Sequence, residues 1–294
     1  MFDFRYHALT LVAVFVALVI GLLLGVAIGD QGLVSGAEQD LRQSLRGDVT
    51  KARAEAQALR DELAVHREYE EQTFVPLVAG HLDNRRIALI FVGARDDRVF
   101  RGVRDAVVAG GGELSFVTTL RAPLELDALA RLAVGTRYED IAQEPELLGD
   151  LGERIGEQII QGGRLIGTLR PELLSSSNGE LTAVEGVVIA RSPAADRLEG
   201  AAAQHAKSFV DGLTRGLRLA RAPAVGVEQR ATDPSQVRWY VEHELASVDN
   251  VDQVAGMASL VFALAGEADG HYGVKSTADA LLPDALTGRG TPTG

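Results

Sequence analysis

The feature that most constrains this chain is an uninterrupted apolar run near its N-terminus. Residues 8–28 read ALTLVAVFVALVIGLLLGVAI and include no charged side chain. A helix rises about 1.5 Å per residue, so the run would span ~31 Å, close to the hydrocarbon thickness of a bilayer. Inside lipid a lone segment must pair all its backbone N–H and C=O groups internally, which a helix does. The run therefore predicts a transmembrane helix over residues 8–29, after a short N-terminal segment, residues 1–7.

A cleaved signal peptide is the alternative interpretation of this run, because Ala27-Ile28-Gly29 resembles a small-x-small cleavage site. The apolar stretch of a signal peptide is only about 7–15 residues long, which favours a retained anchor. Arg5 precedes the run, and the next basic residue after it is Arg42. Since Lys and Arg favour the cytoplasmic side, we expect a single-pass protein of the cell membrane. Its N-terminus would be cytoplasmic and the bulk of the chain extracytoplasmic.

Glycine recurs at every fourth position of this run, at Gly21, Gly25 and Gly29. At that spacing the glycines share one helix face and allow two helix backbones to approach closely. Glycine is also common in membrane helices in general, so the spacing alone leaves a non-associating helix open. Together with the pattern that follows, it favours a homodimer.

The segment 33–74 is rich in Ala, Glu, Arg, Gln and Leu, which predicts a long helix. Its apolar and small residues recur at spacings of three and four, the pattern of a coiled-coil seam. The seam residues include Leu41, Leu45, Val49, Ala52, Ala56, Leu59 and Leu63. Two chains anchored in one membrane with the same topology pair in parallel, so we expect a dimeric coiled-coil stalk. A single amphipathic helix packed on the chain's own domain is the alternative.

Weak positions in this seam bear on what the stalk can bind. Ala52 and Ala56 bury little apolar area, and Gly47 is expected to interrupt the helix. We therefore expect a marginal stalk that is open to an envelope protein partner.

From residue 84 onward, short apolar runs alternate with helical patterns. Strands are predicted at 86–93, 113–119, 186–190, 224–228 and 246–249. Helical spacing covers 96–109, 122–148, 150–161, 196–220, 235–245 and 253–265, whereas Pro, Ser and Gly mark 170–180 as a loop. This alternation predicts an α/β domain over residues 84–286, with a Rossmann- or flavodoxin-like, mostly parallel sheet flanked by helices. Residues 287–294 offer no core residues and predict a mobile tail.

Three stretches together resemble a known family. They are the opening MFDFRYHALTLVAVFVALVIGLLLGVAIGD, the Ala/Glu/Arg helix, and the segment 247–283 with its SVDNVD, GHYG and LLP motifs. Over nearly its full length the chain resembles the MctB-type copper transport proteins of actinobacterial envelopes. The resemblance implies membrane association and a role in copper transport or homeostasis. It also implies a scaffold, since members look like the membrane partner of a cell-wall assembly pair that engages an envelope hydrolase system.

The residues themselves offer few ligands for copper. Copper(I) prefers Cys and Met and copper(II) accepts His, but the chain has no Cys and two Met. The candidate metal ligands are His243, between two glutamates, and His271, in a Gly-bounded loop, with a solvated surface residue as the alternative for His243. A membrane helix without charged side chains also lacks the groups that mark an ion pathway. No cofactor is evident, and copper is implied by the resemblance alone.

No motif predicts an enzyme. The loop Gly93-Ala94-Arg95-Asp96 follows the first strand without the glycine spacing of a nucleotide loop, although Arg95 could meet an anion or be solvated. Asp249 and Asp252 lie near the expected carboxyl edge of the sheet, where they could bind a cation or cap the next helix. A net charge of −12 disfavours nucleic acid as a partner.

These observations combine into one prediction with one alternative. We expect a membrane-anchored, dimeric, non-catalytic component of copper transport or homeostasis. The alternative is a coiled-coil scaffold that recruits a cell-wall hydrolase or division partner.

Overall fold

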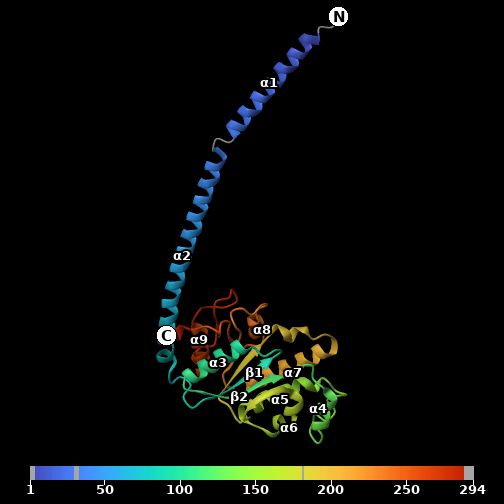
Figure 1. The fold of residues 1–294 in the computed structure, drawn as a ribbon. Helices are drawn as coiled ribbons and strands as arrows, with labels where there is room; N and C mark the ends of the chain where they lie inside the picture. The colour runs from blue at the N-terminus through green and yellow to red at the C-terminus, as the bar shows by residue number, and fades with distance from the viewer. Residues whose placement is uncertain (1–3, 30–32, 181, 288–294) are drawn as a thin grey trace. The chain divides into compact units, whose positions relative to one another are not determined.

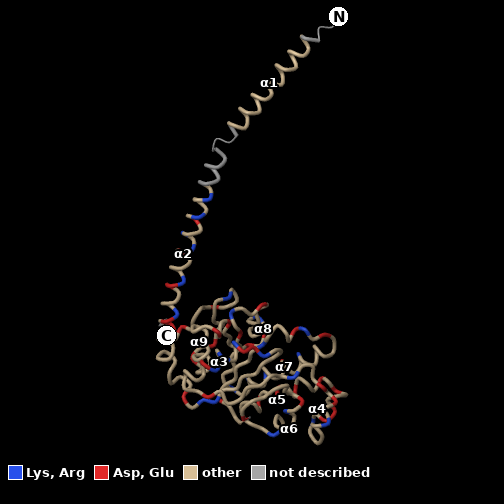
Figure 2. The backbone as a smooth tube through the Cα atoms, viewed as in Figure 1, with Lys and Arg blue, Asp and Glu red and all other residues tan. Residues whose placement is uncertain are grey.

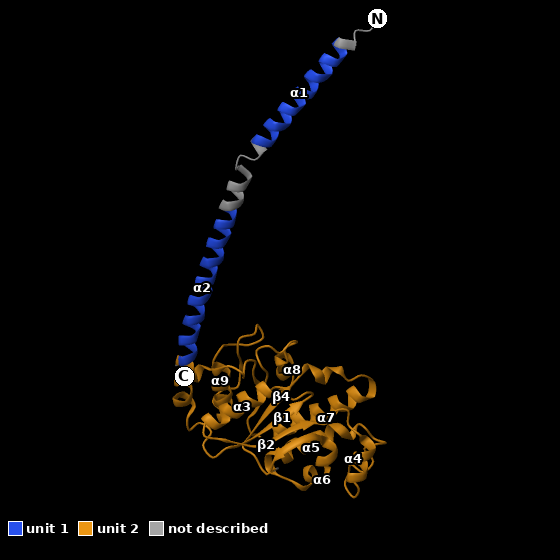
Figure 3. Ribbon diagram, viewed as in Figure 1, with its two compact units in different colours: residues 1–68 blue, residues 69–294 orange. Residues whose placement is uncertain are grey.

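The computed structural model describes residues 4–29, 33–180 and 182–287. The chain divides into two compact units, residues 1–68 and 69–294 (Figure 3). The predicted tail, 287–294, lies outside the described residues apart from its first residue. Residues 1–3 of the predicted N-terminal segment and residues 30–32, directly after Gly29, lie outside them as well.

The first unit consists of α1 (Phe4–Gly29) and most of α2 (Leu33–Val78) (Figure 1). Within α1, residues 6–27 are long enough and apolar enough to cross a membrane by length and composition. Figure 2 shows no charged residue along them, whereas α2 carries both signs of charge. The expected interruption at Gly47 is wrong, because α2 continues through it as one helix of 46 residues. An exposed glycine costs a helix only about 1 kcal/mol relative to alanine.

A seven-stranded sheet in the order β3-β2-β1-β4-β5-β6-β7 forms the centre of the second unit. Its strands are β1 (Arg86–Val92), β2 (Glu113–Leu120), β3 (Leu174–Gly179), β4 (Gly186–Arg191), β5 (Ala224–Val227), β6 (Ala246–Val248) and β7 (His271–Tyr272). The pairings are parallel except for the antiparallel pair of β2 and β3. From β1 the chain builds outward to β3 and then returns to place β4 on the other side of β1. The strand order therefore reverses between β1 and β4.

The central strands bury both faces. In β1, Ala88, Ile90 and Val92 contact one apolar cluster, and Ile87, Leu89 and Phe91 contact another. Helices on both sides supply the remaining core: α4 (Leu126–Leu132), α5 (Leu147–Gln161), α6 (Arg164–Leu173) and α7 (Gly200–Leu219) on the first face, and α3 (Asp97–Ala109) and α9 (Val254–Ala265) on the second. The predicted α/β architecture, a mostly parallel sheet flanked by helices, is confirmed.

The end of α2 belongs to this second unit. Phe74 and Val78 are buried in the second cluster. The helix thus extends four residues beyond the predicted segment 33–74, and its last turns pack in the core of the domain.

The predicted loop at 170–180 is wrong. Residues 164–173 form α6, and residues 174–179 form β3 at the edge of the sheet. The Ser-rich sequence is tolerated because the side chains after Leu174 are exposed, so the strand depends on backbone pairing with β2. One side chain reinforces that pairing, since the Thr118 hydroxyl donates to the Ser176 carbonyl at 2.8 Å.

Turns interrupt two of the predicted helices in the structure. Only Leu126–Leu132 is helical between residues 122 and 146, since Pro123, Gly135 and Pro145 divide the segment into turns. Likewise 196–220 divides into a 3₁₀ turn, η1 (Pro193–Arg197), and α7. The remaining helices are α8 (Val237–Glu242) and α10 (Asp284–Thr287).

Glycines join α5 to α7 through direct backbone contact. A Cβ at Gly212 would lie 2.0 Å from the Gly149 carbonyl oxygen, and a Cβ at Gly216 would lie 2.0 Å from that of Glu153. On the facing helix, a Cβ at Gly152 would lie 2.1 Å from the Phe209 carbonyl oxygen. Such distances leave room only for hydrogen on the Cα, the geometry of Cα–H···O contacts between close helices.

This contact predicts opposite effects for two Gly-to-Ala changes. Gly212→Ala would force α5 and α7 apart and cost about 1–3 kcal/mol or more, because backbone cannot move aside as a side chain can. The matched control, Gly167→Ala in α6, meets nothing within 4 Å and is expected to gain about 0.5–1 kcal/mol from helix propensity. Thermal unfolding of the full chain in a nonionic detergent measures both, and equal stability of the two variants would contradict the contact.

Candidate functional site

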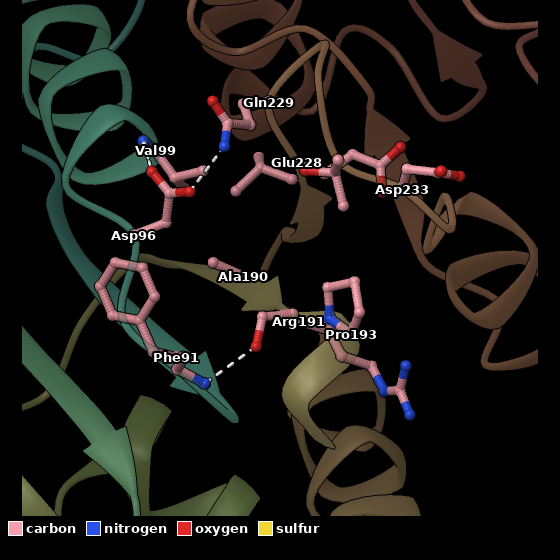
Figure 4. A pocket seen from close by; sticks show the side chains of 13 residues that line it. Phe91, Asp96, Val99, Ala190, Arg191, Pro193, Glu228, Gln229 and Asp233 are labelled. Carbon is pink, nitrogen blue, oxygen red and sulfur yellow. Dashed lines mark hydrogen bonds between the residues drawn. The ribbon is translucent and has the colours of Figure 1, made fainter. Parts of the chain in front are cut away.

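The place where α/β proteins usually bind ligands is the carboxyl edge of the sheet, where the strand order reverses. Here the ends of β1, β4 and β5 surround a pocket of about 190 Å³. In Figure 4, Asp96 and Gln229 lie on one side of it and Glu228 and Asp233 on the other, with Ala190 between them. The pocket is smaller than the ~300–1,000 Å³ of most small-molecule sites.

The loop after β1 has its anion-binding position filled by the protein itself. Asp96 is the N-cap of α3, and its carboxylate accepts hydrogen bonds from the backbone N–H groups of Arg98 and Val99 at 2.8 and 3.1 Å. Those groups are the ones that would bind a phosphate at a helix N-terminus. A Cβ at Gly93 would lie 2.6 Å from the Ser192 hydroxyl oxygen, so the loop after β4 packs directly against the loop after β1.

Arg95, a candidate for meeting an anion, contacts side chains in the first turn of α3. Its guanidinium lies 4.5 Å from the centre of the Phe100 ring, and its Nε contacts an Asp97 carboxylate oxygen at 3.3 Å. It is a partly exposed surface arginine with an ion partner on its own helix.

A buried ion pair lies at the end of β5. Glu228 is 1% exposed, and its carboxylate accepts hydrogen bonds from Lys275 Nζ at 2.6 Å and the Ser235 hydroxyl at 2.7 Å. The Lys275 ammonium also donates to the Thr232 carbonyl at 2.7 Å. This pair ties the segment after β7 to the centre of the sheet. The sequence analysis placed Glu228 at the end of a predicted strand, 224–228, and nothing marked it or Lys275 as partners.

Tyr240 connects the ends of β4 and β5 at the same edge. Its buried ring packs against Gly226, where a Cβ would lie 2.3 Å from a ring carbon. The hydroxyl accepts from the Arg191 backbone N–H and donates to the Val227 carbonyl, both at 2.9 Å. Burial raises the pKa of the Tyr240 hydroxyl far above its ordinary value. The phenol therefore stays a neutral structural bridge between the two strands.

His243, the first candidate metal ligand, is not a solvated surface residue. Its side chain is 13% exposed and stacks on Trp239 with ring centres 3.9 Å apart. Nδ1 lies 2.8 Å from the Trp239 carbonyl oxygen, and Nε2 lies 2.9 Å from a carboxylate oxygen of Asp211. Both ring nitrogens therefore have hydrogen-bond partners within the protein.

The carboxylate of Asp211 contacts two side chains, Lys207 and His243. Burial raises its pKa, but hydrogen bonds from Lys207 and His243 outweigh that effect and hold the pKa below the ordinary value of 3.8. The hydrogen bond between Asp211 and His243 therefore connects α7 with the end of α8.

His271, the second candidate, lies in β7. Its Nδ1 is 2.9 Å from the Ser247 hydroxyl oxygen on the neighbouring strand. Among the described residues, no group of three or more His, Asp or Glu side chains is arranged to hold a metal ion.

Asp249 and Asp252 do not cap α9, so that prediction is wrong. The N-cap of α9 is Gln253, which makes no side-chain capping bond. Asp249 is fully buried and accepts from the backbone N–H groups of Val274 and Lys275 at 2.8 and 2.9 Å. Asp252 accepts from the Arg230 backbone N–H at 2.8 Å. Both carboxylates fasten loops at the sheet edge instead.

The residues singled out in the first unit are open. Nothing lies within 4 Å of a Cβ built on Gly21 or Gly25. On α2 the large seam side chains are about half exposed: Leu41 60%, Leu45 54%, Val49 48%, Leu59 60% and Leu63 53%. Ala52 is exposed and Ala56 is partly exposed. One chain alone therefore leaves a row of apolar side chains facing outward along a single helix.

A family model decides the relationship of this chain to known proteins. The model of MctB, described as a copper transport outer membrane protein, matches residues 1–283. The chain belongs to this family. A search of curated proteins found no match. MctB is a family of copper transport proteins and not a known enzyme family. The family match and the membrane-length helix α1 together support a membrane-associated copper transport protein.

The buried ion pair at the sheet edge can be tested by removing its cation. Lys275→Met leaves the Glu228 carboxylate without its charge partner, which is expected to cost about 3–5 kcal/mol of unfolding free energy. The double variant with Glu228→Gln should lose less than the sum of the single changes, because it removes both charges. Thermal unfolding of the four proteins gives the coupling, and purely additive losses would contradict an energetic link.

The Asp211 cluster predicts a dependence on pH. A carboxyl whose pKa is lowered in the folded state adds stability above its unfolded value and loses it as the pH falls through the folded value. Asp211→Asn should therefore melt below the unmodified protein at pH 5, with the difference closing as the pH falls below about 3.8. The control Asp105→Asn, in an exposed pair, should show almost no difference at any pH. A difference for Asp211→Asn that is the same at pH 5 and at pH 3 would refute the assignment.

Proposed function

We propose that this protein is a single-pass, membrane-anchored, non-catalytic component of copper transport or homeostasis that acts as a parallel homodimer. The observation that carries the proposal is the exposed apolar row on α2, from Leu41 to Leu63, directly after a membrane-length helix. A seam of spacing three and four is buried when a second helix packs against it in the same direction. Full burial of each leucine or valine would contribute about 1.5–3 kcal/mol.

The glycine face of α1 supports the same dimer. Gly21 and Gly25 lie one turn apart with open space around them, which allows a second α1 to approach closely. With the basic Arg5 before the helix, we place the N-terminus in the cytoplasm and the α/β domain outside it. A dimer held at two successive helices would present a pair of domains away from the membrane.

A scaffold role is the second candidate, favoured by the weakness of the seam at its middle. Ala52 and Ala56 provide small knobs there, so a helix of a cell-wall hydrolase or division protein could compete for the position. The chain also supplies few soft ligands for copper, with no Cys and two Met. In this candidate the chain would act through an envelope protein that it captures.

Cysteine crosslinking tests the parallel dimer, because the chain has no cysteine of its own. Val49→Cys is expected to form a disulfide-linked dimer in membranes on mild oxidation, since a seam residue faces its own copy in an in-register parallel pair. Ala54→Cys, on the opposite side of α2, is the matched control and should crosslink several-fold less. Equal crosslinking of the two variants would show that the seam does not form the interface.

Two pairs of charge substitutions test whether the seam of α2 holds the dimer without contributing to the stability of the domain. Leu45→Glu plus Leu59→Glu should convert the dimer to monomer by light scattering, with the melting temperature of the domain unchanged. Ala54→Glu plus Val65→Glu, which adds the same charge off the seam, should remain dimeric. Melting that falls together with the dimer would mean that the helix belongs to the domain core.

Copper titration of the same purified material distinguishes the two candidates. Direct copper binding by the dimer supports the transport role. Capture of an identified cell-wall hydrolase or division protein, lost in the Leu45→Glu and Leu59→Glu variant and without copper binding, supports the scaffold.

A further inference from the structure

A second cavity lies at the carboxyl edge of the sheet, on the side of β1 that faces β2. It measures about 430 Å³, within the ~300–1,000 Å³ range of small-molecule sites. Its walls come from the ends of β1 and β2, the segment around η1, and α7. This cavity is therefore larger than the pocket of Figure 4 at the same edge of the sheet.

The walls of this cavity are apolar. Apart from Gly93, Arg121 and Ser175, every described residue that lines it has an apolar side chain. The largest are Val92, Leu120, Leu124, Leu198, Phe209 and Val210. Apolar walls around open space lose the packing contacts that a filled core would have, so an apolar ligand would be favoured there.

One cationic group stands among these walls. The Nε–H of Arg121 is buried and has no acceptor among the residues that the structure describes. The Nη2 of the same guanidinium donates to the Pro171 carbonyl at 2.9 Å, which fixes the side chain at the end of α6. A buried donor without an acceptor is costly, and a guanidinium donor is satisfied best by an anionic oxygen.

The neighbouring cavity shares part of these walls. It measures about 340 Å³ and is lined by five of the same residues, which include Leu198, Ala206 and Val210. The segment 192–199 thus lies between two openings, and a chain longer than the first cavity could continue into the second.

We propose that this cavity binds an amphipathic anion, an aliphatic chain with a carboxylate or phosphate head. The apolar side chains take the chain, and the guanidinium of Arg121, which lines the cavity, binds the head. The ligand is placed at the same sheet edge as in other open α/β sheets, but without the phosphate loop, whose position Asp96 fills. The proposal is independent of dimer formation.

Photolabelling tests the site in the full chain, reconstituted in phosphatidylcholine nanodiscs. The probes are an eight-carbon carboxylate, the phosphate ester of the matching alcohol, and the alcohol itself, each with a diazirine near the chain end. Labelled residues are mapped by mass spectrometry, and labelling of α1 by probe dissolved in lipid serves as the internal reference. The anionic probes are expected to label segments 92–94, 120–124 and 194–210 at least about tenfold more than the alcohol does, a difference of about 1.4 kcal/mol.

Two variants and a control complete the test. Arg121→Gln keeps a donor for the Pro171 carbonyl but removes the charge, and should lower labelling of the cavity by the anions about tenfold. Ala206→Phe fills the cavity and should abolish labelling by all probes. Arg131→Gln, an exposed arginine of α4, should have no effect. Preference for the carboxylate over the phosphate ester, or the reverse, identifies the head group.

Two results would overturn the proposal. Labelling of the cavity by the alcohol as efficient as by the anions would remove the role of Arg121, and this comparison needs only the unmodified chain. Labelling confined to α1, or undiminished in Ala206→Phe, would place the probes outside the cavity.

Discussion

Burial of both faces of the central strands is the constraint on which the domain depends. β1 and β4 send alternate side chains into two separate apolar clusters, so neither face can be left to solvent. Each face therefore needs its own layer of helices.

A chain that covers both faces must cross from one side of the first strand to the other, which reverses the strand order between β1 and β4. That reversal separates the loops at the carboxyl edge and creates the space in which the pockets lie. The glycine contact between α5 and α7 belongs to the same design, because it brings two helices close enough to cover one face.

At that edge the polar side chains hold the structure together. Asp96 fills a helix N-terminus, Glu228 is paired with Lys275, and Asp249 binds two backbone N–H groups. A carboxylate that is buried and fully bonded is unavailable as a base or as a ligand, since freeing it would leave its partners unsatisfied. The sheet edge thus carries the residue types of an active site while its carboxylates serve the fold. This agrees with a family named for copper transport and gives no support for catalysis.

The sequence predicted what depends on periodicity and missed what depends on pairing. The apolar runs of β1 and β4 and the membrane-length run in α1 were recognisable because burial alone determines them. β3 was missed, since Ser176 and its neighbours are held by the backbone of β2 and their side chains carry no apolar signal. The environment of His243, a candidate metal ligand with a solvated position as the alternative, was missed because its partner Asp211 comes from a distant helix. The contact of Lys275 with Glu228 links residues 47 positions apart, and no local sequence pattern predicts such a contact.

Glycines at every fourth position occur within α1, α5 and α7. Gly152 and Gly156 in α5 and Gly212 and Gly216 in α7 face one another, and each glycine contacts backbone of the other helix. In α5 and α7 this spacing therefore allows close helix packing. Gly21 and Gly25 in α1 have the same spacing but no neighbour within 4 Å, and the apolar row that follows on α2 is also uncovered.

Within a bilayer, lipid tails cover an apolar surface as well as a helix does, but they do not fit into a glycine face as closely as another backbone. Outside the bilayer, half-exposed leucines in a row face water and gain from burial. In the proposed parallel dimer, a second copy of the chain would cover both the glycine face of α1 and the apolar row of α2.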